Sequence, residues 1–143
     1  MIHGLDTGFL VAAEVLEHPK HSDARTKLAT FLAAGDRFAL ASQVLAEFIH
    51  IVTDPKRFAM PLGMQDARDV AQKWWTASEV IQISCEAPAV AQFFDWHRHH
   101  ALGRKRILDT LLAASYHVAG IDSILTTNPQ DFAILGIFQC VDI

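Results

Sequence analysis

The chain alternates between short apolar runs and longer segments in which apolar residues recur every three or four positions. Short apolar runs are typical of buried strands, whereas the longer spacing is typical of helices that bury one face. The pattern predicts strands over residues 2–5, 37–41, 80–84, 121–127 and 136–143. It predicts helices over residues 9–15, 22–34, 42–52, 64–79, 86–103 and 104–120, with a connecting loop over 54–63.

The order of these elements indicates the fold class. Strands separated by helices favour a mostly parallel sheet that is covered by helices on both faces. With 143 residues, no repeat and no linker-like segment, we expect one α/β domain over residues 1–143. In such sheets the functional groups gather at the carboxyl ends of the strands. That rule brings Asp6, the region of Ser42 and the segment 127–131 to one rim.

Residues at the helix ends refine this picture. Gly35 follows the helix over 22–34, where a left-handed backbone conformation favours glycine. Ser42 is predicted as the N-cap of the helix over 42–52, because a serine side chain there accepts a hydrogen bond from a free backbone N–H.

Composition and charge exclude few functions. The net charge of −4 does not suit a basic, nonspecific nucleic-acid binder. It does not exclude a nuclease, because a site built from carboxylates is acidic until metal binds. No apolar run is long enough to span a bilayer and the start lacks a secretory signal, so we expect a cytoplasmic protein. Cys85 and Cys140 are then expected to be buried free thiols.

Asp6, in the stretch GLDTGFL, is open to three interpretations. Asp-Thr-Gly is how an aspartic protease presents half of its catalytic dyad, but that needs a mostly β chain and a second such triplet, which this sequence lacks. Asp6 or Thr7 could cap the helix that follows. Asp6 could also offer a metal-binding carboxylate at the end of the first strand.

Two further acids have comparable positions. Glu47 lies off the apolar face of its helix, close to the carboxyl end of a strand, although a solvated surface glutamate is the alternative. Asp109 lies in a first helical turn, where the helix dipole favours a negative charge. Arg104, Lys105 and Arg106 precede it and either pair with nearby acids or contact substrate phosphates.

The last cluster, TTNPQD, contains Thr127, Asn128 and Asp131 directly after a strand. Asn-Pro with a nearby Asp is common in turns, and a turn at this end of a strand is also where a site would be built. Together these residues place three acids and an Asn/Asp pair at one edge of the sheet. Crowded carboxylates favour a hard cation such as Mg²⁺ or Mn²⁺, which could activate water to attack a phosphodiester.

The eight histidines suggest zinc as a rival metal. Zinc needs three or four convergent ligands, and the spacing of His18 and His21 lacks the glutamate of an HExxH motif. We therefore expect surface or packed histidines. The clustered aromatic residues are expected to face the core or a partner: Trp74, Trp75, Phe93, Phe94 and Trp96.

Four blocks together resemble a known family: DTGFL, SQVLAEF, LDTLLAASYHVAG and LTTNPQDF. Their order over the whole chain is similar to that of PIN domains, and most similar to the VapC-type toxins of bacterial toxin–antitoxin pairs. The resemblance implies a three-layer α/β/α fold and an RNA endonuclease dependent on Mg²⁺ or Mn²⁺, with tRNA among the candidate substrates. It also implies a homodimer and a cognate antitoxin whose tail enters the site.

The resemblance assigns roles to this chain's residues. It implies that Asp6 and Asp109 hold the metal and that Glu47 completes the acidic site, with either Asn128 or Asp131 in the fourth position. Gly8 departs from the family, which commonly has Ser or Asn after Asp-Thr. A PIN-fold module that binds RNA or protein without cleavage, and a nuclease for DNA, remain the alternatives. The candidate substrate contacts are Thr7, Ser42, Thr127 and the basic triplet Arg104, Lys105 and Arg106.

Overall fold

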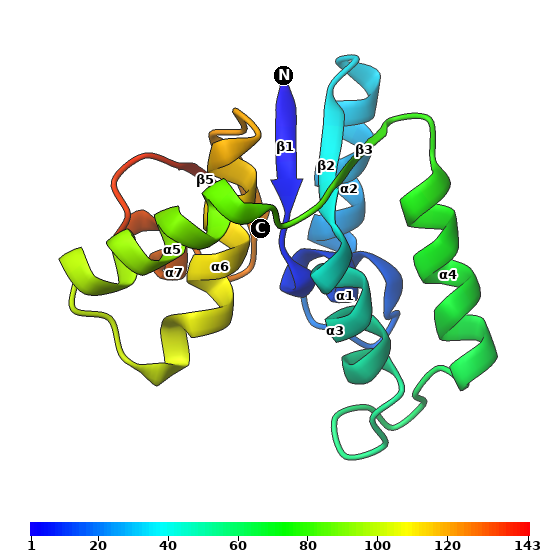
Figure 1. Cartoon of the computed structure of the whole chain (residues 1–143). Coiled ribbons are helices and arrows are strands. Elements are labelled where there is room, and N and C mark those ends of the chain that lie inside the picture. Colours follow the sequence, from blue (N-terminus) through cyan, green and yellow to red (C-terminus); the bar gives the residue numbers. More distant parts are fainter.

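The computed structural model describes residues 1–143 and contains a sheet of five parallel strands in the order β3-β2-β1-β4-β5 (Figure 1). The strands are β1 (Ile2–Leu5), β2 (Arg37–Ala41), β3 (Val80–Ile83), β4 (Ser123–Thr126) and β5 (Gln139–Asp142). All four neighbouring pairs are parallel, so the predicted sheet is confirmed and has no antiparallel edge.

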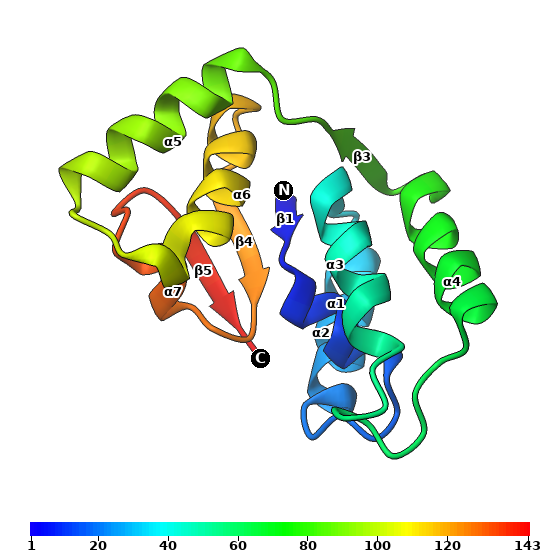
Figure 2. The same cartoon turned by 60° about the horizontal axis from the view of Figure 1, so that its bottom comes forward.

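The helices form a layer on each face of the sheet. The elements are α1 (Thr7–Glu14), α2 (His21–Ala33), α3 (Ser42–Val52), α4 (Met64–Thr76), α5 (Ala87–His99), the 3₁₀ helix η1 (Arg104–Arg106), α6 (Ile107–Val118) and α7 (Gln130–Ala133). Helices α1–α4 lie on one side of β1 and α5–α7 on the other (Figure 2). The predicted three-layer α/β/α architecture is confirmed. None of these helices combines the length and the apolar character that crossing a bilayer would require.

The strand order reverses its direction at β1. The chain first adds β2 and β3 on one side of β1, then crosses over to place β4 and β5 on the other side. In parallel sheets a crevice forms at such a reversal, outside the carboxyl ends of the two strands concerned. Here these are β1, which ends at Leu5, and β4, which ends at Thr126.

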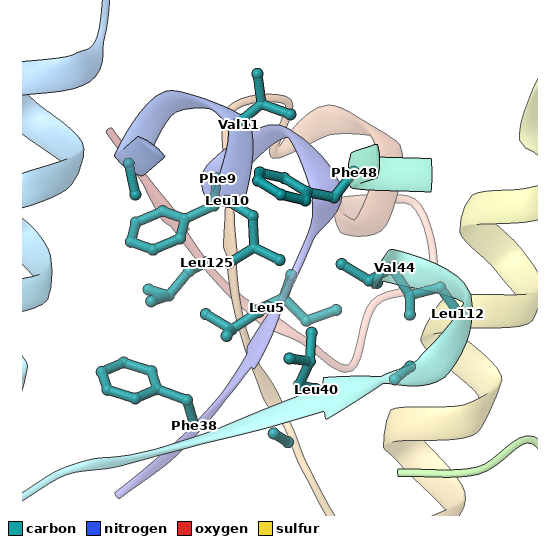
Figure 3. Packing of buried hydrophobic residues seen from close by; sticks show 14 of the residues in the cluster. Leu5, Phe9, Leu10, Val11, Phe38, Leu40, Val44, Phe48, Leu112 and Leu125 are labelled. Carbon is teal, nitrogen blue, oxygen red and sulfur yellow. The ribbon is translucent and has the colours of Figure 1, made fainter. Parts of the chain in front are cut away.

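The core is one continuous cluster of 27 buried residues. Figure 3 shows Leu5 of β1 surrounded by apolar side chains from both neighbouring strands and from the helices. Phe9 and Leu10 turn from α1 toward this cluster and are completely buried, as is Leu125 of β4. The residue after β1 is therefore held between a packed strand and a packed helix.

Tyr116 of α6 fastens the carboxyl ends of β1 and β2 to each other. Its completely buried hydroxyl donates to the carbonyl oxygen of Leu5 at 2.7 Å and accepts from the N–H of Ala41 at 3.2 Å. The ring packs on Gly4, where an added Cβ would lie 2.7 Å from Tyr116 Cδ2. This contact explains why β1 has glycine at that position.

The helix ends partly match the predictions. Gly35 follows α2 with a φ of +81°, as predicted for a left-handed position. The prediction for Ser42 is wrong, because the N-cap of α3 is Ala41 and no side chain caps that helix. Strand β2 runs directly into α3, so Ser42 is already the first helical residue.

The prediction of buried thiols is also wrong. Cys85 is exposed and Cys140 is half-buried, because they lie after β3 and within β5, the two edge strands of the sheet. Among the clustered aromatic residues, Trp74, Trp75 and Trp96 pack against the core, whereas Phe94 is 57% exposed.

Candidate active site

Asp6 lies at the strand reversal, between β1 and α1, and its side chain is fixed from both directions. Its Oδ1 accepts from the N–H of Thr7 at 2.8 Å, which makes Asp6 the N-cap of α1. Its Oδ2 accepts from the hydroxyl of Thr126 at 2.7 Å. Asp6 is only 9% exposed, so capping the helix and presenting a carboxylate at the strand end are compatible roles.

Thr126 connects Asp6 to the turn that follows β4. The oxygen of its hydroxyl, which donates to Asp6, also accepts from the N–H of Asn128 at 3.0 Å. Sequence reasoning missed Thr126. Its role depends on β4 lying next to β1, with Leu125 beside Leu5, and no local pattern encodes that register.

Asp109 in the first turn of α6 and Glu47 in α3 bring two more negative charges close to Asp6. The pKa of Asp6 is raised to about 6, mainly by burial and also by the charges of Asp109 and Glu47, while its hydrogen bonds with Thr126 and Thr7 lower it. The pKa of Asp109 is raised by burial and then by Glu47, while Arg106 lowers it. The three predicted acids therefore form one electrostatically coupled group, which we call the acid site.

The acid site opens into a cleft of about 550 Å³. That volume is within the usual range for ligand pockets, roughly 300–1,000 Å³. The residues singled out in the sequence that line it are Asp6, Thr7, Glu47, Asp109, Thr127, Asn128 and Asp131. Segments from the start, middle and end of the chain thus meet at one edge of the sheet, where the sequence analysis placed them.

The remaining candidates lie outside this cleft. Ser42 is exposed at the start of α3, and Arg104 and Lys105 are exposed in η1 without an ion-pair partner. Arg106 does not line the cleft, but it forms an ion pair with Asp131, which does. Of the three basic residues that precede α6, Arg106 alone is therefore tied to the site.

The two candidates for the fourth position differ in their partners. Asp131, in α7, is half-buried and forms an ion pair with Arg106. Asn128 is exposed, and its side-chain amide donates to the Thr127 hydroxyl at 3.3 Å. Asn128 therefore presents an uncharged amide to the cleft, whereas the carboxylate of Asp131 is already paired.

Besides Val11 of α1 and Ile51 of α3, three loop residues that the sequence analysis did not assign to this site also line the cleft: His18, Arg57 and Phe58. They lie in the α1–α2 and α3–α4 loops, whose polar sequences carry no periodic signal. The Nδ1 of His18 accepts from the N–H of Lys20 at 3.1 Å, so the proton of the neutral ring is on Nε2. The pKa of His18 is lowered by burial and by the charges of Lys20 and His21.

The acid site has the donor chemistry that suits a hard divalent cation. Asp6 and Asp109 are desolvated carboxylates that repel each other, and the hydroxyl oxygen of Thr7 beside them is buried without a hydrogen-bond partner. No three His, Cys, Asp or Glu side chains are already gathered at metal-binding distances. Mg²⁺ does not require such a cage, because it commonly keeps several waters and takes one or two carboxylates. The residues present therefore fit an ion held by Asp6 and Asp109.

Several known proteins resemble this chain in sequence and in structure. Ribonuclease VapC24 of Mycobacterium tuberculosis (strain CDC 1551 / Oshkosh) is 24% identical over 143 residues, which cover 96% of this chain and 94% of the relative. The crystal structure of Mycobacterium tuberculosis VapC20, described as a toxin that cleaves the sarcin–ricin loop, superposes with a TM-score of 0.73 at 18% identity, covering 100% of this chain and 98% of that one.

A second solved structure, VapBC2 from Rickettsia felis bound to a DNA fragment from its promoter, has a TM-score of 0.71 at 19% identity and covers 100% of this chain and 99% of that one. At these identities the solved structures establish the shared fold. The sequence itself matches the family model for the PIN domain over residues 5–136. Because this match takes in the acid site and nearly the whole chain, the protein belongs to the PIN domain family.

Proposed function

We propose that this protein is a cytoplasmic endoribonuclease that requires Mg²⁺ or Mn²⁺ and that it acts as the toxin of a toxin–antitoxin pair. The observation that carries the proposal is the pair of desolvated carboxylates, Asp6 and Asp109, whose raised pKa values reflect burial and repulsion by neighbouring carboxylates. Holding such groups together is costly unless a cation neutralises them. The relative named Ribonuclease VapC24 supports RNA as the substrate.

In this proposal the residues of the acid site have different roles in binding and orienting the metal ion. Asp6 and Asp109 hold the ion, and Glu47 adds negative charge beside both. When bound, the ion would lower the pKa of a water molecule and stabilise the oxygen that leaves the phosphodiester. The Thr7 N–H and the Thr126 hydroxyl keep both oxygens of Asp6 in place, so the carboxylate needs no reorientation during the reaction.

Substrate contacts are proposed for the polar residues of the cleft. Thr7, Thr127 and Asn128 line it with groups that can donate to phosphate or base oxygens. Arg106 does not line the cleft and is connected to it through its ion pair with Asp131. Ser42, Arg104 and Lys105 lie outside the cleft, so in this proposal they meet only parts of the RNA that extend beyond it.

The proposal is tested by incubating the purified chain with RNA, tRNA included, in the presence of Mg²⁺ or Mn²⁺. Cleavage is expected with either ion and none in EDTA. Asp6→Asn and Asp109→Asn are expected to abolish it, with Asp69→Asn on the exposed surface of α4 as the control. If both site variants cut RNA as fast as the parent, the assignment of the acid site is wrong.

The alternative is a PIN-fold module that binds RNA or protein without cleavage. Calorimetric titration with Mn²⁺ separates the two possibilities, because a binding module has no need of the ion. Absence of heat at millimolar Mn²⁺ favours the module. A nuclease with the same acids but a preference for DNA is distinguished by offering both substrates to the same preparation.

An antitoxin partner and a homodimer belong to the same proposal. The similar fold of VapBC2 from Rickettsia felis supports the first. Expression of this chain alone in bacteria is expected to arrest growth, and Asp109→Asn should relieve the arrest at equal protein levels.

Light scattering on the purified chain tests the dimer, and a monomer at all concentrations would contradict it.

A further inference from the structure

The cleft has a second side that the acid site does not use. His18 from the α1–α2 loop and Arg57 and Phe58 from the α3–α4 loop line the same cleft as Asp6, Glu47 and Asp109. We call these three residues the loop patch. The two loops run near each other below α1 and α3, on the side away from α6 and α7 (Figure 2).

The loop patch is held in place by hydrogen bonds. The carboxylate of Glu17, next to His18, accepts from the backbone N–H groups of Ala59 and Met60 at 3.2 and 3.0 Å, which ties the two loops together. The N–H groups of Arg57 and Phe58 donate to the carbonyl oxygen of Asp54 at 3.1 and 3.3 Å. The backbone that carries the patch is therefore an ordered turn.

Arg57 gives this side of the cleft its charge. It is the only Arg or Lys that lines the cleft, whereas four carboxylates line the rest. Its side chain is 61% exposed and its closest acid is Asp54, with Nε and Oδ2 3.7 Å apart. An exposed pair of this length is weak, so the guanidinium can exchange it for a phosphate oxygen.

Phe58 and His18 supply the contacts that suit a base. Phe58 is half-buried and packs against the core, which fixes its ring at the edge of the cleft. Aromatic rings held in this way are stacking platforms for unpaired bases. His18, with Nδ1 occupied by the N–H of Lys20, has Nε2–H free as a donor.

We infer that the loop patch is a nucleotide subsite that holds one unpaired nucleotide of the RNA beside the acid site, with Arg57 on its phosphate and Phe58 and His18 on its base. The inference rests on the proposed ribonuclease function and deepens it, because it assigns the contacts with one nucleotide of the RNA to three residues outside the acid site. A base inside a duplex is already stacked on its neighbours and cannot reach a ring at the edge of a cleft.

The test measures RNA binding without cleavage, by fluorescence anisotropy of a labelled single-stranded RNA on the full chain carrying Asp109→Asn. Arg57→Gln is expected to weaken binding about tenfold at low salt and to reduce the slope of log affinity against log salt by about 0.7, the value for one phosphate contact on a single strand. Phe58→Leu is expected to weaken binding about tenfold without changing that slope, because stacking involves no counterion. His18→Gln should weaken it less.

Arg98→Gln is the matched control. Arg98 is 78% exposed and pairs with Asp95 at 3.8 Å with the same three-residue spacing, but it lies on α5 and does not line the cleft. Its substitution should leave affinity and slope unchanged. Arg57→Lys should retain the slope and Phe58→Tyr the affinity, which distinguishes loss of contact from misfolding.

The outcomes separate the inference from the proposed function. If the parent cleaves single-stranded RNA but Arg57→Gln and Phe58→Leu bind it like Arg98→Gln, the loop patch is not a subsite and the ribonuclease assignment stands. Binding of duplex RNA as tightly as single-stranded RNA would also overturn the inference. If the parent neither binds nor cleaves RNA, the proposed function itself fails.

Discussion

The hydroxyl of Thr127 occupies the space that any side chain at position 8 would need. A Cβ added to Gly8 in the first turn of α1 would overlap Thr127 Oγ1, which also accepts from the amide of Asn128 at 3.3 Å. The resemblance described in the sequence analysis implies Ser or Asn at this position, and the structure leaves no space for such a side chain. Thr127, which lies more than a hundred residues later in the chain, fills the space beside Gly8.

This contact makes the effect of Gly8→Ala depend on residue 127. In the parent, the added methyl group must displace the hydroxyl of Thr127, and we expect a loss of about 1–3 kcal/mol in the free energy of unfolding. In a Thr127→Ala background the space is open, and alanine should stabilise the helix by up to about 1 kcal/mol relative to glycine. Urea unfolding of the parent, Gly8→Ala, Thr127→Ala and the double variant measures whether alanine at position 8 lowers or raises the free energy of unfolding in each background. A stabilising Gly8→Ala in the parent would contradict the contact.

The raised pKa of Asp6 makes stability depend on pH. The pKa of Asp6 is about 6 in the folded protein, against 3.8 for an ordinary Asp side chain such as that of the unfolded chain. Ionising Asp6 therefore costs more free energy in the folded state than in the unfolded state. The free energy of unfolding should therefore fall as pH rises from about 4 to about 6, and stay lower above that range, by roughly 3 kcal/mol in total.

Asp6→Asn removes the contribution of Asp6 to this dependence and leaves that of Asp109, whose pKa is also raised. In EDTA the variant should be more stable than the parent above pH 6, and the difference should shrink toward zero near pH 4. Urea unfolding between pH 4 and pH 8 measures it, with Asp69→Asn as the surface control. Mn²⁺ should stabilise the parent above pH 6 but not Asp6→Asn. A parent that grows more stable relative to Asp6→Asn as pH rises in EDTA would contradict the assigned cause.

The ion pair between Arg106 and Asp131 leads us to expect that Asp131 positions Arg106 and does not bind the metal ion. If Asp131 serves mainly to hold Arg106, then Asp131→Asn, Arg106→Gln and the double variant should lose similar amounts of activity, with a coupling energy of about 1 kcal/mol. Mn²⁺ affinity should remain close to that of the parent in Asp131→Asn. A large loss of Mn²⁺ affinity, and additive losses in the double variant, would instead make Asp131 the fourth metal-site acid.

Substituting Tyr116, which lies in the core, should change the stability of the fold. Tyr116→Phe keeps the ring but leaves the carbonyl of Leu5 and the N–H of Ala41 without their partner inside the core. The free energy of unfolding should fall by about 1–3 kcal/mol, the usual cost of stranding buried polar groups. Chemical denaturation measures the change, and a loss below about 0.5 kcal/mol would show that these groups find other partners.

Local patterns in the sequence predicted the five strands and most helices and suggested the three acids, but they did not predict α7 or separate η1 from α6. Apolar spacing is set by the geometry of each helix or strand, so the positions of β1, β2, α2 and α3 could be predicted within a residue or two. Asp6, Glu47 and Asp109 were candidates because they lie near strand ends or helix starts, which are local features, and the resemblance to PIN domains suggested their roles.

The tertiary structure decided which side chains meet. Thr126 reaches Asp6 only because β4 lies beside β1 in one register, and Gly8 is required only because Thr127 fills its space. The loop patch of His18, Arg57 and Phe58 forms because Glu17 ties two loops together that are 40 or so residues apart. Such contacts arise from how distant segments pack, and no periodicity within a single segment records them.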